Sequence, residues 1–225
     1  MTAALSYLGH CAFLWETDRG RKILVDPFGN SPTDHWFSQT FPPVETDAVA
    51  VTHQHFDHSA IDGLPGSPTI LRGAGEFRLD DISVRGIADL HSGESGRRGL
   101  RNTMFVVEAS GVRFCHIGDN RHDIPDGVVT LVGTVDVLMV TVDDSCHLLS
   151  YQEVDGLIAR LSPRVVVPMH YCIPGLTTKE STLKTPDGWI ATRSAVRRLG
   201  SSCVRLTPES LPDETEVWMF DARLA

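Results

Sequence analysis

The chain contains the segment Ala48-Val49-Ala50-Val51-Thr52-His53-Gln54-His55-Phe56-Asp57-His58. Its apolar first half predicts a buried strand, and the second half is rich in side chains that can bind a metal ion. Residues two apart in an extended segment project to the same side, so His53 and His55 can reach one metal together. Asp57 and His58 lie past the strand end, where the chain turns, and can serve a second metal nearby. The segment therefore predicts a two-metal site at a strand end.

The competing interpretation is a polar loop that happens to be rich in histidine, which three imidazoles and a carboxylate in one short run make hard to sustain. Further candidate ligands follow other predicted strands, and each alone is weak. They are His91 after Ile82–Ala88, Asp119 after Val112–Ile117, and His170 after the apolar run Val165–Val167. Because a rigid scaffold presents side chains at strand ends, we expect these residues to converge on the first cluster.

The composition is that of an ordinary globular protein, with 225 residues, 41% hydrophobic and 22% charged. We expect one domain spanning residues 1–225, since no linker, internal repeat or low-complexity tract divides the chain. No run approaches the ~18–20 apolar residues of a membrane span, and no secretory signal is visible at the N-terminus. Five scattered cysteines without a CxxC pair favour free thiols in a reducing compartment, so a cytoplasmic location is expected.

The formal net charge of −9 argues against long nucleic acids as partners. Their affinity for proteins comes mainly from the neutralisation of phosphates. The basic pairs Arg97-Arg98 and Arg197-Arg198 are isolated and form no stripe. The expected partner is a small-molecule substrate, and assembly into a homo-oligomer is left open.

Short apolar runs broken by Gly, Pro and Asp predict a chain rich in strands. The predicted strands are Leu5–Leu8, Cys11–Thr17, Lys22–Val25, Asp47–Thr52, Thr69–Arg72, Ile82–Ala88, Thr103–Ala109, Val112–Ile117, Val135–Val142, Arg164–Met169, Cys203–Thr207 and Glu216–Phe220. An apolar stripe predicts a helix over Ser150–Leu161, and a second helix is predicted over Asp187–Leu199, followed by Gly200. Strands in both halves with interspersed helices predict two sheets packed face to face with helices outside.

The candidate ligands and their order resemble the metallo-β-lactamase superfamily. The matching motifs are His53-x-His55-x-Asp57-His58, Leu90-His91-Ser92, Gly118-Asp119 and His170. Within the superfamily the chain is most similar to the small UlaG-like, Zn-dependent hydrolase group. The motifs that carry this likeness are Tyr7-Leu8-Gly9-His10-Cys11-Ala12-Phe13, Ile23-Leu24-Val25-Asp26-Pro27, Asn102-Thr103 and Pro168-Met169-His170-Tyr171.

The resemblance implies an α/β fold, the four-layer αββα sandwich, with two mixed β-sheets face to face and helices outside. It also implies two divalent metal ions, zinc foremost, with manganese or iron as alternatives. The implied ligands are His53, His55 and His91 for the first ion, Asp57, His58 and His170 for the second, and Asp119 bridging both. The implied reaction is hydrolysis, in which a metal-bridging hydroxide cleaves a small-molecule ester, lactone or phosphodiester and Asp57 orients that hydroxide.

Two more histidines bear on the site. His147 follows the apolar run Val135–Val142, so it could bind substrate or protonate a leaving group, as a third catalytic candidate beside Asp57 and Asp119. A solvated loop histidine is the competing interpretation. His10 belongs to the opening Gly-His motif and is expected to support the site rather than to bind metal.

Two long connections are candidates for substrate choice. The segment Ile173–Gly188 follows His170 closely, and Lys179 and Lys184 within it would give affinity for an anionic substrate, although a solvated surface loop is the alternative. The segment Asp26–Pro43 contains aromatic residues that would wall a pocket, cover the core or pack against another subunit. They are Phe28, Trp36, Phe37 and Phe41.

The main alternative function is a non-hydrolytic use of the same scaffold, either iron-based redox chemistry or a metal-dependent binding module. A redox flavoprotein would need a flavin domain, for which 225 residues leave no obvious room, and the complete ligand set argues against a degenerate binding module. A phosphodiesterase or nuclease is a further alternative. Nuclease members of the superfamily usually carry an inserted domain or a basic surface, and the sequence has neither.

Overall fold

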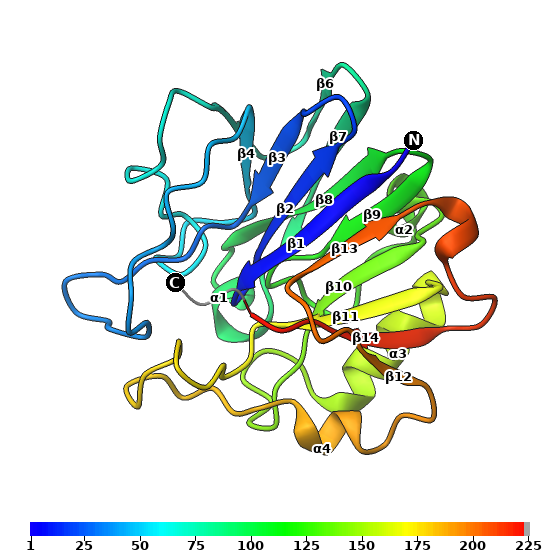
Figure 1. Cartoon of the computed structure of the whole chain (residues 1–225). Coiled ribbons are helices and arrows are strands. Elements are labelled where there is room, and N and C mark those ends of the chain that lie inside the picture. Colours follow the sequence, from blue (N-terminus) through cyan, green and yellow to red (C-terminus); the bar gives the residue numbers. More distant parts are fainter. Residues whose placement is uncertain (223–225) are drawn as a thin grey trace.

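The computed structural model describes residues 1–222, and most of their apolar runs are β-strands (Figure 1). One sheet contains β1 (Ala3–Gly9), β2 (Ala12–Thr17), β3 (Lys22–Val25), β4 (Ala48–Val51), β5 (Thr69–Arg72) and β13 (Cys203–Leu206). Its strand order is β13-β1-β2-β3-β4-β5. The other sheet contains β6 (Gly75–Leu79), β7 (Ile82–Leu90), β8 (Arg101–Ala109), β9 (Val112–His116), β10 (Val137–Thr141), β11 (Val165–Met169), β12 (Val196–Arg198) and β14 (Glu216–Met219). Its order is β12-β14-β11-β10-β9-β8-β7-β6.

Both sheets are mixed, which confirms the predicted sandwich of two mixed β-sheets. In the six-stranded sheet β1, β2 and β3 pair antiparallel, and β3, β4 and β5 pair parallel. In the eight-stranded sheet β6 to β9 form an antiparallel meander, and β9, β10, β11 and β14 pair parallel. The hairpin between β8 and β9 turns at Ser110 and Gly111, whose φ angles of 52° and 79° are those of a type I′ turn.

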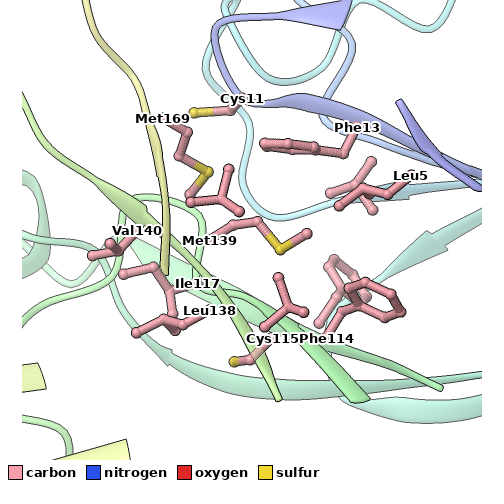
Figure 2. Close-up of a cluster of buried hydrophobic side chains, with 14 of the residues drawn as sticks. Leu5, Cys11, Phe13, Phe114, Cys115, Ile117, Leu138, Met139, Val140 and Met169 are labelled. Carbon is pink, nitrogen blue, oxygen red and sulfur yellow. The ribbon is translucent and has the colours of Figure 1, made fainter. Parts of the chain in front are cut away.

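The core lies between the inner faces of the two sheets. Figure 2 shows Leu5 and Phe13 of the six-stranded sheet facing Phe114 and Met139 of the eight-stranded sheet. The rings of Trp15 and Phe114 meet across this interface with centroids 5.7 Å apart. Strands β10 and β11 are fully buried along their length, as their continuous apolar sequences predict.

The helices are few and short. They are α1 (Gly93–Arg97), α2 (Asp126–Val132), α3 (Tyr151–Leu161) and α4 (Asp187–Ile190), with a 3₁₀ turn at Pro208–Ser210. Helix α3 begins with the capping box of Ser150 and Glu153 and packs its apolar face on β10. Helix α2 packs on β7 of the same sheet. No helix within residues 1–222 is long and apolar enough to cross a membrane.

The predicted helix over Asp187–Leu199 is wrong. Only the four residues of α4 are helical, and Val196–Arg198 instead form the edge strand β12, which pairs parallel with β14. The hydroxyl of Thr192 donates to the carbonyl of Trp189, and Arg193 lies over the Trp189 ring while pairing with Asp155. These contacts end the helix, and pairing with a sheet edge outweighs the local helical preference of the following residues.

The topology brings several strand ends to one edge of the sandwich. Strands β7, β9, β10 and β11 run in the same direction, because β7 and β9 both pair antiparallel with β8 while β9, β10 and β11 pair parallel. Their carboxyl ends therefore share an edge of the eight-stranded sheet. The segments that leave these ends contain His91, Asp119, His147 and His170.

Candidate metal centre

The turn after β4 delivers the first four candidate ligands. The backbone N–H of His58 donates to the carbonyl of His55, and the Ser59 hydroxyl donates to the same oxygen, which closes the turn. His53, Asp57 and His58 are buried, whereas His55 is partly exposed. The chain thus folds back within one turn and presents its imidazoles and carboxylate to a common interior.

Two groups of side chains meet at this point, and each could hold a metal ion. The first group is His53, His55, His91 and Asp119; the second is His10, Asp57, His58 and His170. Within each group the candidate ligand atoms all lie within 4.8 Å of one another. The structure therefore brings together all seven residues expected to bind metal, and it adds His10 to the second group.

Asp119 touches both groups through its two carboxylate oxygens. Its Oδ2 lies 3.6 Å from His53 Nε2 and 3.4 Å from the Nε2 atoms of His91 and His170. Its Oδ1 lies 3.4 Å from His58 Nε2. In the second group, Asp57 Oδ2 lies 3.5 Å from His170 Nε2 and 3.6 Å from His58 Nε2. Asp119 is thus placed where a bridging carboxylate would be.

These spacings fit the coordination shell of a metal better than hydrogen bonds. Six nitrogen-to-oxygen distances fall between 3.4 and 3.6 Å, at or beyond the outer limit for a hydrogen bond. Two ligand atoms on a tetrahedral ion with bonds of about 2.0–2.1 Å lie roughly 3.3–3.4 Å apart. His58 Nε2, His91 Nε2 and Asp119 Oδ1 are buried and have no hydrogen-bond partner among residues 1–222. The residues present therefore fit metal ions.

The outward-facing nitrogens of three imidazoles are held by hydrogen bonds. His53 Nδ1 lies 3.0 Å from Thr52 Oγ1, His58 Nδ1 lies 2.8 Å from Asp26 Oδ2, and His91 Nδ1 lies 2.7 Å from the Ser92 carbonyl. A proton on each Nδ1 satisfies these acceptors and leaves Nε2 as a lone pair facing the site. Such outer contacts fix the tautomer and orientation of metal-binding histidines.

Asp26 connects the outer contacts of the two groups, a role that its sequence pattern does not predict. Its Oδ2 accepts from His58 Nδ1 and from the Thr52 hydroxyl, which in turn accepts from His53 Nδ1. Its Oδ1 accepts from the Thr52 backbone N–H. Asp26 is fully buried with φ of 48° at the end of β3. Its position directly after an apolar strand was the available signal, but its contacts depend on the tertiary fold.

The loop that presents Asp119 is fixed by a buried amide. Asn102 in β8 accepts from the Asp119 backbone N–H and donates to the Ile117 carbonyl. Gly118 has φ of 57°, and a Cβ there would lie 2.6 Å from Asn102 Oδ1 and 2.7 Å from Thr52 Cβ. Glycine is therefore required for the close approach of this loop to Thr52.

The ionisable groups of the site strongly shift one another's pKa values. Burial would raise the pKa of Asp119, but His170 and His58 hold that pKa well below its ordinary value. Burial would lower the pKa of His170, but Asp119 and Asp57 raise it to about 9. Burial and the nearby His58 lower the pKa of His53 to about 3. These opposed shifts follow from the close approach of buried imidazoles and carboxylates.

His10 and His147 flank the two groups. His10 Nε2 lies 3.0 Å from Asp57 Oδ2, and burial together with His170 lowers the pKa of His10 to about 4. His147 is exposed and lines the hollow above the site, with its ring stacked on that of His170 at 5.8 Å. Its Nδ1 lies 3.2 Å from the Thr182 hydroxyl, and its backbone N–H donates to Asp143. His147 is therefore oriented by its neighbours and is not a freely solvated loop residue.

Comparison with known proteins agrees with this geometry. Residues 4–170 match the family profile of the beta-lactamase superfamily domain. A UPF0173 protein of Pyrococcus furiosus is 30% identical over 189 residues, which cover 73% of this chain and 81% of the relative. A UPF0173 metal-dependent hydrolase of Rubrobacter xylanophilus is 30% identical over 203 residues, which cover 74% of this chain and 81% of the relative.

A solved structure from Thermotoga maritima is also similar, and it is assigned as a Zn-dependent hydrolase of the metallo-β-lactamase superfamily. It is 26% identical, with a TM-score of 0.74, and the match covers 98% of this chain and 100% of that structure. The region matched by the family profile extends from β1 to His170 and contains every member of the two groups. The chain therefore belongs to the beta-lactamase superfamily.

Proposed function

We propose that the chain is a metal-dependent hydrolase with a binuclear centre. The observation that carries the proposal is the set of six nitrogen-to-oxygen distances between 3.4 and 3.6 Å around Asp57 and Asp119. Such spacings would be expected of two adjacent coordination shells that share one carboxylate. The names of the UPF0173 relatives, which are described as metal-dependent hydrolases, support the same class of activity.

The proposed ligands are the members of the two groups other than His10, which contacts Asp57. His53, His55 and His91 would hold one ion, Asp57, His58 and His170 would hold the other, and Asp119 would serve both. Imidazole and carboxylate ligands suit zinc, with manganese or iron(II) as alternatives. Divalent ions held there would supply Lewis acidity and would lower the pKa of a coordinated water to about 7.

Side chains around the proposed ligands orient those ligands and contact the substrate. Asp26 and Thr52 hold His53 and His58 in the tautomer that directs Nε2 inward. His10, whose Nε2 lies against Asp57 Oδ2, fixes the rotamer of that carboxylate. His147, with Nδ1 held by Thr182, offers its other nitrogen to a substrate in the hollow above the site. We assign His147 a role in substrate binding at the reacting group.

The proposed substrate is a small molecule with an ester, lactone or phosphodiester bond. The free state of all five cysteines is in keeping with a reducing, cytoplasmic location, which forms part of the proposal. Long nucleic acid is not a favoured partner for a chain of net charge −9. A homo-oligomeric state remains compatible with the proposal.

The test is a substrate screen with defined metal content. The metal-free protein is loaded separately with zinc, manganese and iron(II), and each form is assayed on 4-nitrophenyl esters, aliphatic lactones, thioesters and bis(4-nitrophenyl) phosphate. Asp119→Ala is the control, because it removes the shared carboxylate. We expect hydrolysis that requires metal, falls to background in Asp119→Ala and accompanies binding of two ions per chain.

Two outcomes would contradict the proposal. Fewer than one ion per chain after reconstitution, unchanged by His55→Ala, would remove the metal centre. Full metal occupancy without hydrolysis of any substrate class would favour the non-hydrolytic alternative, and oxygen consumption by the iron-loaded form would identify redox chemistry.

A further inference from the structure

The hollow above the two groups has apolar side chains in its wall, next to the candidate ligands. It encloses about 320 Å³ and is open to solvent. Apart from the candidate ligands, its wall includes Trp36, Phe56 and Leu148, with Ser92, Glu94 and His147 beside them. The apolar residues come from the turn after β4, the segment before β4 and the segment after β10. A substrate entering this hollow meets an aromatic wall next to the candidate metal centre.

Trp36 is the central member of this wall. Its ring packs edge-to-face on Phe56 with centroids 5.5 Å apart and on His147 at 5.7 Å. It also lies 6.5 Å from the ring of His170. Trp36 is half-buried, whereas Trp15, Trp189 and Trp218 are fully buried in the core. Trp36 is therefore the tryptophan that a ligand in the hollow can touch.

The backbone around Trp36 is fixed by two chain segments. The Thr178 N–H donates to the Trp36 carbonyl at 2.8 Å, and the Ser38 N–H donates to the Leu176 carbonyl at 2.8 Å. The side chain of Asn30 binds both the N–H and the carbonyl of Phe37. The segment after β11 thus pins Trp36 in place, and the wall is formed before a ligand arrives.

The charge of the hollow disfavours anions. Within residues 1–222, no lysine or arginine is among the residues that line it, and Glu94 adds a carboxylate at the rim. Lys179 and Lys184 are exposed and lie outside the lining. Arg98 pairs with Glu94, and Arg121 is held by Asp89 beneath the site. The charge of a bound phosphodiester would have to be balanced by the metals alone.

We infer that the preferred substrate is an uncharged carboxylic ester or lactone with an apolar group that packs on Trp36. This inference rests on the proposed hydrolase function and narrows it. In the reaction, water oxygen forms the new bond to the acyl carbon and the ester C–O bond breaks. The alcohol leaves with one proton of the water, and the carboxylic acid releases the other to solvent. Trp36 acts as a specificity-determining residue and takes no part in bond making.

A matched substrate pair tests the charge preference. 4-Nitrophenyl butyrate and 4-nitrophenyl hydrogen succinate share a leaving group and a four-carbon acyl chain, but only the succinate carries a carboxylate. We expect kcat/KM of the zinc-loaded protein to favour the butyrate at least about tenfold, because the butyrate chain can pack on Trp36 whereas no lysine or arginine among the lining residues would compensate the desolvation of the succinate carboxylate. Equal rates, or faster turnover of the succinate or of bis(4-nitrophenyl) phosphate, would overturn the inference.

Variants test the role of Trp36. Trp36→Ala is expected to lower kcat/KM for the butyrate by about three- to tenfold, the usual effect of one aromatic contact. Trp36→Phe should retain most of the activity. His35→Ala is the control, since that exposed side chain is outside the lining and its carbonyl, which accepts from Thr178, is retained. An unchanged kcat/KM in Trp36→Ala would show that Trp36 does not determine specificity.

A binding measurement separates this inference from the proposed function. A neutral aryl ketone that cannot be hydrolysed should quench tryptophan fluorescence on titration, and Trp36→Phe should abolish the quenching because the other tryptophans are buried. An analogue that carries a carboxylate should bind at least about tenfold more weakly. If no substrate is hydrolysed but the ketone still quenches Trp36, the hydrolase proposal fails alone. Tighter binding of the carboxylate analogue overturns the inference with or without turnover.

Discussion

At the scale of single residues, Asp26 is the least expected part of the site. It joins the supports of both groups, because His58 and Thr52 donate to its carboxylate and His53 donates to Thr52. The convergence of the candidate ligands could be predicted, since their order along the chain resembles a known family. Asp26 could not, because its role arises from a positive φ at the end of β3 and from the approach of the turn after β4.

Replacing Asp26 tests whether its carboxylate holds the candidate ligands in place. Asp26→Asn keeps the shape and tolerates a positive φ, but it weakens the acceptor that holds His58. We expect zinc affinity to fall about 10- to 100-fold, as is typical for the loss of an outer contact to a ligand. Competition with a fluorescent chelator measures it. Asp34→Asn, in a loop outside both groups, is the control, and equal affinity of the two variants would contradict the role of Asp26.

The protons of the metal-free site predict a pH dependence of metal binding. His170 has a pKa of about 9, and the pKa of His58 is also raised by Asp119 and Asp57 against the effect of burial. A metal must displace these protons, so apparent zinc affinity should increase as pH rises from 6.5 to about 9. Calorimetry in buffers of different ionisation enthalpy should detect proton release at pH 7. A flat profile would contradict these assignments.

His147 is predicted to act on substrate and not on metal. Its ring stacks on His170 and its Nδ1 contacts Thr182. We expect His147→Ala to reduce kcat/KM by about tenfold, the effect of losing one hydrogen bond to the substrate, with metal content unchanged. His122→Ala, an exposed histidine that pairs with Glu153, is the control. Loss of metal in His147→Ala, or unchanged kinetics, would remove this role.

At the scale of elements, the apolar sequence pattern predicted the buried strands correctly, but the helix predicted over Asp187–Leu199 was wrong. The runs that became β10 and β11 are apolar throughout, and burial on both faces of a parallel sheet follows from that pattern. The segment Val196–Arg198 has no such signature. It is a strand because β14 offers an open edge, a fact of the assembled sheet that no local pattern contains.

The turn between β9 and Asn120 is predicted to depend on Gly118. Gly118→Ala would place a methyl group against Asn102 and Thr52 at a positive φ. We expect the free energy of unfolding of the metal-free protein to fall by about 1–3 kcal/mol, a typical magnitude for a strained backbone position, and zinc affinity to fall with it. Urea denaturation measures the first effect.

Gly127→Ala in helix α2 is the matched control for this substitution. A Cβ at Gly127 would meet nothing within 4 Å, and alanine is the better helix former. The control should therefore be as stable as the parent or slightly more stable. Equal stability of the two variants would show that Asp119 does not depend on the close approach of Gly118 to its neighbours.

At the scale of the whole molecule, the candidate site depends on the packing of the two sheets. The run from His53 to His58 lies after a strand of the six-stranded sheet, and His91, Asp119 and His170 follow strands of the eight-stranded sheet. The two groups can form only when the sheets pack together. The class of the fold could be predicted because it is implied by ligands that must converge from both sheets. For the aromatic residues of the segment Asp26–Pro43, a pocket wall was only one of three roles that the sequence predicted.

The binuclear centre can be tested by anomalous scattering from crystals of the zinc-loaded protein at the zinc absorption edge. Two peaks are expected at this edge of the sandwich. One peak should lie about 2.0–2.2 Å from ligand atoms of His53, His55 and His91, and the other at the same distance from Asp57, His58 and His170, with Asp119 bonded to both. A single peak, or peaks away from these residues with Asp119 bonded to neither, would contradict the binuclear centre.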